Sequence, residues 1–275
     1  MRITAGIDVG STYTKVVLVD RAGDVLATAM EPTGFRLAEV AAQALEKALA
    51  LARVERKDVA YVVATGFGRH QVAFADVHIT DLTAAARGAT RLFPGTRTIL
   101  DVGGQTMKAS RLGEGATVRS FRLNDKCAAG TGAFLEKTAR YMGYSTTEIG
   151  PLVDTSKDAT SISGVCAVFA ESEVINHLSQ GVAPADIMHG AIVSLVGRSV
   201  QLMKRVQMEK EFTLIGGILR FEAMARVVRE TLQSEVNVPS PALVQYVPAF
   251  GAALLGQRRL DVIEAGPPAA SEAAV

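Results

Sequence analysis

The chain contains 275 residues, enough for two modest domains or for one large domain with a repeated core. Its 29 Lys and Arg nearly balance its 28 Asp and Glu, so the charge gives no indication of a nucleic-acid or acidic-membrane partner. Two Cys are too few for a disulfide scaffold, and charged residues interrupt every apolar stretch before it could span a membrane. A strand pattern begins almost at once and no signal region is visible. Together with the low number of Cys, this leads us to expect a cytoplasmic protein.

Residues 1–95 are predicted to form a first subdomain. Three short β patterns separated by turn residues indicate an antiparallel meander over residues 3–10, 13–20 and 24–30. Apolar residues at helical spacing then predict two helices on either side of a further strand, at 36–54 and 80–93 around the strand at 59–68.

Residues 96–262 are predicted to form a second subdomain, which begins with the same plan. Its short strands are expected at 97–104, 107–113, 116–123 and 212–217. Its helices are expected at about 130–142, 145–153, 167–180, 184–207 and 221–234. Residues 263–275 are rich in Pro and Ala and are expected to form a disordered tail.

The two subdomains share an internal repeat. The segment IDVGSTYTK begins at Ile7 and LDVGGQTMK begins at Leu100, and in each a Lys follows the glycine of Asp-Val-Gly by five positions. Each segment lies at a hairpin between two predicted strands. Matches in two equivalent settings indicate two related β-rich subdomains that face each other across a cleft.

The two Asp-Val-Gly turns are candidate phosphate-binding sites. Glycine permits a close backbone approach, so that successive N–H groups can point at a phosphate. We expect Asp8 and Asp101 to hold Mg²⁺ directly or through water, and Gln105 to orient water or phosphate. The other candidate nucleotide-binding residues here are Gly10, Ser11, Thr12, Tyr13, Thr14, Lys15, Gly103 and Gly104. The alternative interpretation is a pair of ordinary glycine hairpins.

A third candidate lies in TLIGGILRF, where Gly216 and Gly217 separate an apolar strand from a helix. These glycines would let the backbone lie against an adenosine, and Gln245 precedes a small-residue helix that could close the nucleotide pocket. A plain strand-to-helix turn is the alternative. The sequence contains neither the P-loop pattern nor a strand–GxGxxG–helix unit, so a nucleotide would need another fold.

The cysteines Cys127, in NDKCAAGTGAFLE, and Cys166, in CAVFAESEV, both stand just before predicted helices. A helix N-terminus favours the thiolate form. From the residues alone, three interpretations stay open: buried apolar fillers, a redox disulfide, or metal ligands. A 4Fe–4S cluster needs four thiolates, so the metal interpretation requires two subunits, each contributing two.

The order DVGSTYTK, LDVGGQTMK, IGGI and FGAALLG resembles the superfamily of actin, sugar kinases and 70-kDa heat-shock ATPases over nearly the whole chain. The segments ATGFGR, NDKCAAGTGAFLE and CAVFAESEVINHLSQG are more specific. They resemble the ATPase family of 2-hydroxyacyl-CoA dehydratase activators and benzoyl-CoA reductase ATP-binding subunits. The chain departs from that family after Gly217, where Ile218-Leu219-Arg220-Phe221 replaces a small residue and then Gln-Asn or Lys-Asn.

This resemblance implies an α/β fold with two RNase H-like, actin-like ATPase subdomains around a cleft for ATP and Mg²⁺. It implies a homodimer, or a heterodimer with a homologous ATPase subunit, that shares one 4Fe–4S cluster through Cys127 and Cys166. Its implied activity is ATP hydrolysis that drives electrons from a donor such as ferredoxin or flavodoxin to a CoA-thioester reductase or dehydratase.

Two other functions remain open from the sequence. A sugar-type small-molecule kinase would need a catalytic base, for which Asp76 and Asp81 are the nearest candidates. A nucleotide-dependent scaffold or chaperone is disfavoured because no peptide-binding β-domain is visible.

Overall fold

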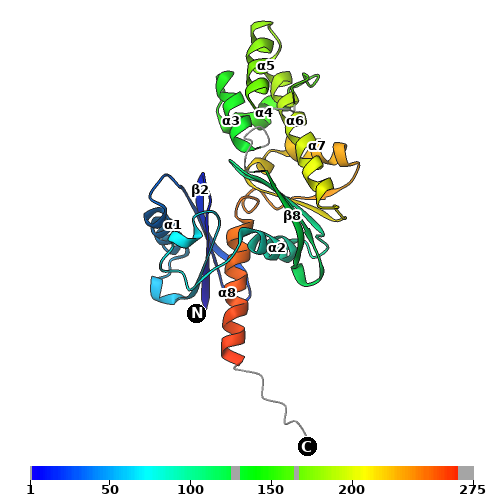
Figure 1. Cartoon of the computed structure of the whole chain (residues 1–275). Helices are drawn as coiled ribbons and strands as arrows, with labels where there is room; N and C mark the ends of the chain where they lie inside the picture. Colours follow the sequence, from blue (N-terminus) through cyan, green and yellow to red (C-terminus); the bar gives the residue numbers. More distant parts are fainter. Residues whose placement is uncertain (1, 125–130, 164–166, 266–275) are drawn as a thin grey trace, which may run out of the picture. The chain divides into compact units, whose positions relative to one another are not determined.

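A computed structural model describes residues 2–124, 131–163 and 167–265 of the chain (Figure 1). Its contacts divide the chain into two compact units. The first runs to Gly88 and also takes the segment from Pro248 onward, and the second is Ala89–Val247. Within the described ranges, no helix is both long enough and apolar enough to cross a membrane.

The first unit is built on a five-stranded sheet with the strand order β3-β2-β1-β4-β5. The strands are β1 (Ile3–Val9), β2 (Tyr13–Val19), β3 (Val25–Pro32), β4 (Val59–Thr65) and β5 (Val77–His78). β1, β2 and β3 form the expected antiparallel meander, and β4 pairs parallel to β1. Every residue of β1 is buried, which places this strand in the middle of the core.

The second unit contains a sheet of the same design, with the order β10-β9-β6-β7-β8. The strands are β6 (Thr98–Val102), β7 (Met107–Leu112), β8 (Val118–Asn124), β9 (Phe212–Ile215) and β10 (Val236–Asn237). β6, β7 and β8 are antiparallel neighbours, and β9 is parallel to β6. Starting from β8, this is the order and direction of the first sheet, so the sequence repeat corresponds to a repeated fold.

Helices of the first unit cover its sheet. They are α1 (Leu37–Ala52), the first turns of α2 (Asp81–Leu92), and α8 (Val247–Ala265). α1 lies between β3 and β4 in the chain and buries an apolar stripe that includes Ala44, Leu45 and Ala48. These side chains pack with Ile7 and Val16 in one hydrophobic cluster, which explains why the helical spacing of residues 36–54 predicts this helix.

α8 packs tightly against β1 through small residues. A side chain on Gly6 would collide with the carbonyl of Ala249, and one on Gly251 would collide with the carbonyl of Ala84 in α2. The Thr4 hydroxyl donates to the carbonyl of Ala253 at 2.8 Å. The small residues of this helix therefore serve close packing within the first unit. α8 also reaches Ala265, inside the range 263–275 expected as a tail, and the rest of that range lies outside the described residues.

The helices of the second unit are more numerous. They are α3 (Gly132–Tyr141), α4 (Ile149–Val153), α5 (Ala167–Ser179), α6 (Pro184–Arg205) and α7 (Glu222–Leu232). Short 3-10 turns in the chain lie at Arg56–Asp58, Arg69–Gln71, Glu114–Ala116, Thr146–Glu148 and Gly217–Arg220. α3, α4, α5 and α6 all lie between β8 and β9, where the first unit has α1 and a 3-10 turn. They are grouped together on one side of the second unit (Figure 1).

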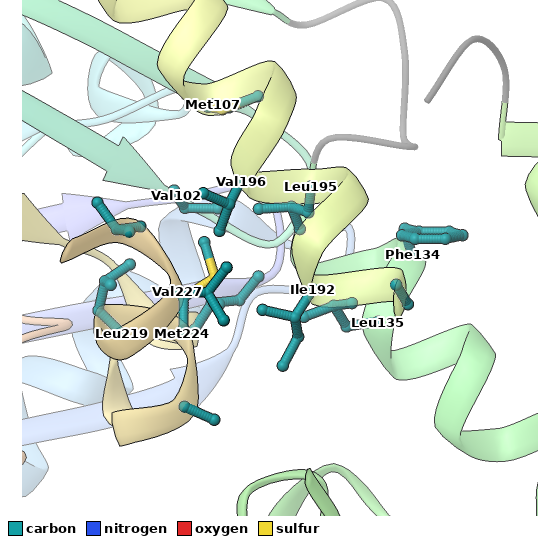
Figure 2. Packing of buried hydrophobic residues seen from close by; sticks show 14 of the residues in the cluster. Val102, Met107, Phe134, Leu135, Ile192, Leu195, Val196, Leu219, Met224 and Val227 are labelled. Atoms are coloured by element: carbon teal, nitrogen blue, oxygen red, sulfur yellow. The ribbon is translucent and has the colours of Figure 1, made fainter. Parts of the chain in front are cut away.

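α6 forms the centre of the second core. Ile192, Leu195 and Val196 on this helix are fully buried. Figure 2 shows these side chains between those of Leu135 on α3 and Met224 on α7. A single apolar cluster therefore joins α3 and α6 to α7 and to sheet residues such as Val102 and Met107.

Candidate functional site

The first Asp-Val-Gly turn connects β1 to β2 and contains an ion pair. Asp8 lies directly opposite Lys15 in the antiparallel pairing of these strands. Lys15 Nζ is 3.1 Å from Asp8 Oδ2, and the two side chains are only 17% and 9% exposed. The strand register therefore fixes a carboxylate and an ammonium group beside the glycine turn.

The turn itself needs a glycine. The N–H of Gly10 donates to the carbonyl of Tyr13 at 3.2 Å, and a Cβ on Gly10 would lie 2.8 Å from that oxygen. Ser11 and Tyr13 are exposed. The hydroxyl of Thr14 is buried and hydrogen-bonded to that of Thr33 at 3.0 Å, so it already has a protein partner. The buried hydroxyl of Thr12 has no hydrogen-bond partner among the described residues.

Two residues beside this turn, Thr65 and Gly66, are not among those predicted from the sequence. Thr65 lies at the end of β4, opposite Asp8, and its buried hydroxyl has no partner among the described residues. Gly66 has φ +87°, and a side chain there would collide with Asp8 Oδ1. In the sequence, the only indication of these residues is a Thr-Gly pair at the end of an apolar strand. Their position beside Asp8 becomes visible only through the parallel pairing of β4 with β1.

The second Asp-Val-Gly turn, between β6 and β7, repeats the geometry of the first. Asp101 lies opposite Lys108, as Asp8 lies opposite Lys15. The N–H of Gly103 donates to the carbonyl of Thr106 at 2.8 Å, the counterpart of the Gly10 bond. Gln105 is exposed at the tip of this turn.

The start of α3 is hydrogen-bonded to this second turn. The N–H groups of Gly132 and Ala133 donate to the carbonyls of Gly103 and Gly104, at 3.0 and 2.8 Å. A Cβ on Gly132 would lie 3.2 Å from the carbonyl oxygen of Gly103, which is tighter than ordinary contact. The candidate phosphate-binding backbone is thus tied directly to a helix end.

The predicted metal ligands Cys127 and Cys166 both lie outside the described residues. α3 begins at Gly132, five positions after Cys127, and α5 begins at Ala167, next to Cys166. Among the described residues, no group of three or more His, Cys, Asp or Glu could hold a metal ion.

α3 and α5 are joined by an ion pair. Lys137 Nζ on α3 lies 2.7 Å from Glu171 Oε2 on α5, and the Tyr141 hydroxyl donates to the same oxygen at 3.4 Å. The hydrogen bond to Glu171 raises the pKa of Lys137, so this lysine stays charged. The helices that follow the two cysteine segments are therefore linked to each other.

The candidate adenosine turn also lies within the second unit. Gly216 has φ +107°, and its N–H donates to the carbonyl of Val244 at 2.9 Å. A side chain on Gly216 would collide with the carbonyl of Val102, the last residue of β6. Gln245 Oε1 lies 3.8 Å from the position of a Cβ on Gly217, so the structure brings Gly216, Gly217 and Gln245 together.

Comparison with known proteins identifies the family to which the chain belongs. A model of the BadF/BadG/BcrA/BcrD ATPase family matches residues 5–256, most of the chain. The chain belongs to this ATPase family. The membership expected from the cysteine motifs is thereby confirmed.

Individual members of the family match over most of their length. The activator of lactoyl-CoA dehydratase from Anaerotignum propionicum is 39% identical over 91% of this chain and 96% of its own. A subunit of the benzoyl-CoA reductase from Thauera aromatica is 35% identical, with 94% of each chain covered. The solved structure of the activator of 2-hydroxyisocaproyl-CoA dehydratase from Clostridium difficile, with bound ADPNP, has a TM-score of 0.89 at 34% identity. The match covers 98% of this chain and 100% of that one, which confirms the predicted α/β, actin-like ATPase fold class.

Proposed function

We propose that this chain hydrolyses ATP and uses that reaction to drive low-potential electron transfer to a partner that reduces or dehydrates a CoA thioester. The observation that carries the proposal is the pair of hydrogen bonds from Gly132 and Ala133 to the second Asp-Val-Gly turn. Through these bonds, a movement of the turn at Gly103 and Gly104 on phosphate binding would shift the start of α3, the helix that follows Cys127. The relatives described above, a dehydratase activator and a reductase component, support this over a sugar kinase.

In the proposed site, backbone N–H groups of the two glycine turns bind the phosphates. Ser11, Thr12 and Lys15 add donors in the first turn, and Gly103 and Gly104 supply the second. The first turn fits this role because the buried hydroxyls of Thr12 and Thr65 are unsatisfied within the described chain, and an anion or its hydration shell would satisfy them.

Asp8 and Asp101 are the proposed Mg²⁺ ligands, directly or through water. Mg²⁺ in nucleotide sites keeps several waters and uses only one or two carboxylates together with the phosphates. The small number of acidic groups at each turn is therefore compatible with it. Asp8 is paired with Lys15 and packed against Gly66, which fixes where its carboxylate points. Gln105 is the proposed residue that orients the attacking water.

The proposed redox group is one 4Fe–4S cluster held by Cys127 and Cys166 of this chain and the same pair from a second subunit. The described residues nearest to them support this, since two helices begin just after the cysteines and helix N-termini stabilise anions. When bound, the cluster supplies an electron of low potential to the partner. The second subunit is a copy of this chain or a homologue, and ferredoxin or flavodoxin is the proposed donor.

The coupling rests on residues of this chain. Phosphate binding changes the backbone at Gly103 and Gly104, and the start of α3 follows through its two hydrogen bonds. The pair between Lys137 and Glu171 passes that movement to α5. A nucleotide can shift the equilibrium between two arrangements of these helices only by the difference in its affinity for them.

An anaerobic purification tests the proposal. We expect about four iron atoms per dimer and Mg²⁺-dependent ATP hydrolysis. Asp8→Asn should lower the hydrolysis rate at least about a hundredfold, because it removes the charge that holds the metal. The control is Asp24→Asn, an exposed residue in the turn between β2 and β3, which should keep the wild-type rate. Iron-free protein would overturn the electron-transfer role, and full activity of Asp8→Asn would overturn the site.

A further inference from the structure

The chain between α4 and Cys166 is held along one face of α6. Residues 154–163 of this segment form neither a helix nor a strand. Asp186, Gly190 and Ser194 follow one another on α6 at intervals of four residues, so they share one face of the helix. We call these three residues the α6 track. Because α6 forms the centre of the second core, the track belongs to a firmly packed helix.

Asp186 holds the beginning of the segment. Its Oδ1 accepts hydrogen bonds from the Ser156 hydroxyl at 2.8 Å and from the N–H groups of Lys157 and Asp158 at 2.8 and 3.2 Å. The Ser156 hydroxyl also lies 3.0 Å from Nδ1 of His189, which is one turn further along α6. One carboxylate therefore satisfies three donors of an irregular stretch of chain.

Gly190 lets the middle of the segment pass close to the helix. The N–H of Thr160 donates to the main-chain carbonyl of Asp186 at 3.0 Å. A Cβ on Gly190 would collide with the carbonyl of Thr160. Glycine disfavours a helix interior by about 1 kcal/mol relative to alanine, so the close approach of the segment gives a physical reason for a glycine here.

The end of the described segment is tied to two helices at once. Ile162 is only 8% exposed and belongs to the apolar cluster around α6. The carbonyl of Ser163 accepts from the Ser194 hydroxyl at 3.3 Å, and its N–H donates to Oε2 of Glu173 on α5. The chain is therefore anchored three positions before Cys166.

We propose that the α6 track positions Cys166 for cluster binding, with Gly190 and Ser194 as positioning residues. The proposal rests on the 4Fe–4S cluster proposed above and assigns residues that set its stability and potential. Three residues span at most about 11 Å, so a displacement of Ser163 reaches the thiolate. Residues that orient metal ligands affect metal affinity, and the exposure of a cluster to water affects its potential.

Iron release and reduction potential test the proposal in the full-length, anaerobically purified protein. Gly190→Ala should release iron to the chelator bathophenanthroline about tenfold faster than the wild type, because the new Cβ displaces the segment. Ser194→Ala, which removes one hydrogen bond, should release it about threefold faster, and it decides the question if Gly190→Ala does not fold. In both variants the midpoint potential measured by EPR should rise, since greater exposure to water favours the more negative, reduced cluster.

Two controls separate positioning from general destabilisation. Gly197→Ala adds a Cβ on the same helix where nothing lies nearby, and Val227→Ala removes buried methyl groups from α7 in the same core. Both should keep the iron-release rate and potential of the wild type. If Val227→Ala speeds iron release as much as Gly190→Ala does, the proposal is overturned. Unchanged values in both track variants would also overturn it and leave the proposed function intact, whereas an iron-free wild type would overturn both.

Discussion

Asp8 and Lys15 face each other across β1 and β2, and the same register places Asp101 opposite Lys108 in the second sheet. The first two residues form an ion pair, with 3.1 Å between Asp8 Oδ2 and Lys15 Nζ. Because the Asp8 side chain is only 9% exposed, removing Lys15 leaves its carboxylate with little access to water in place of the ammonium group. The pair therefore fixes where the Asp8 carboxylate points beside the glycine turn.

The first prediction concerns the stability of this pair. Lys15→Met should lower the free energy of unfolding by about 2 kcal/mol, because it leaves the buried carboxylate of Asp8 unpaired. The double variant Asp8→Asn/Lys15→Met should lose less than Lys15→Met alone, since the stranded charge is gone. Urea unfolding measures both. Lys47→Met, which breaks the exposed pair with Glu31, is the control and should cost at most about 1 kcal/mol.

The second prediction concerns Gly216. Gly216→Ala should destabilise the protein by at least about 3 kcal/mol, because φ +107° is strained for an L residue and the new Cβ would collide with the carbonyl of Val102. Gly197→Ala is the matched control. That glycine is in α6 with open space around its Cβ position, so alanine should stabilise by about 0.5–1 kcal/mol. A tolerated Gly216→Ala would show that the turn relaxes easily and is not fixed as described.

A third prediction uses the acid dependence of stability. The pKa of Asp186 on α6 is lowered, first by the Ser156 hydroxyl, which donates to Oδ1 at 2.8 Å, and then by the N–H groups of Asp158 and Lys157 and the charge of His189. Because the pKa is lower in the folded state, the Asp186 carboxylate makes its full contribution to stability when the pH is above the pKa of the unfolded chain, about 3.9. That contribution disappears as the pH falls from there through the folded pKa.

Asp186→Asn should therefore lower the thermal midpoint at pH 7. Below the unfolded pKa of Asp186, the midpoint of the variant should fall less steeply with decreasing pH than that of the wild type. Thermal unfolding from pH 7 down to the acid transition measures this. Asp158→Asn serves as the control, because its side chain is exposed and should leave the profile unchanged. Parallel pH profiles for wild type and Asp186→Asn would contradict the prediction.

The fourth prediction tests the link between the second turn and α3. Gly132→Val should push the helix start away from the carbonyl of Gly103, which a Cβ would meet at 3.2 Å. In hydrogen exchange, ADP should slow exchange of the α3 amides in the wild type and fail to do so in the variant. Gly197→Ala again provides the control. If ADP protects α3 equally in both proteins, the hydrogen bonds to Gly103 and Gly104 do not transmit nucleotide binding.

Much of this fold was predictable because its signals are local. The repeated Asp-Val-Gly with a Lys five positions later predicted both hairpins, and helical spacing located α1 and α6. β5 and β10 were missed because two-residue strands leave no periodic pattern. The packing of α8 on β1 could not be predicted either. Its small residues suggest close approach, but only the fold shows that Ala249 meets Gly6.

The candidate site residues were named from the same kind of local signal. Glycine turns and strand-end carboxylates have a recognisable order along the chain, so Asp8, Gly103 and Gly216 could be named. Thr65 and Gly66 could not, because their importance comes from parallel pairing with β1, a contact between distant segments. The contact of Gly132 with Gly103 was likewise not predictable, since nothing near Gly132 in the sequence indicates it.

The connection that follows the antiparallel meander contains α1 in the first unit and α3, α4, α5 and α6 in the second, and both cysteines fall within this longer connection. Its last helix, α6, also forms the centre of the second core. The cysteine-bearing stretch is therefore not a removable module, because excising it whole would expose the apolar side chains that it shares with α7 and the sheet.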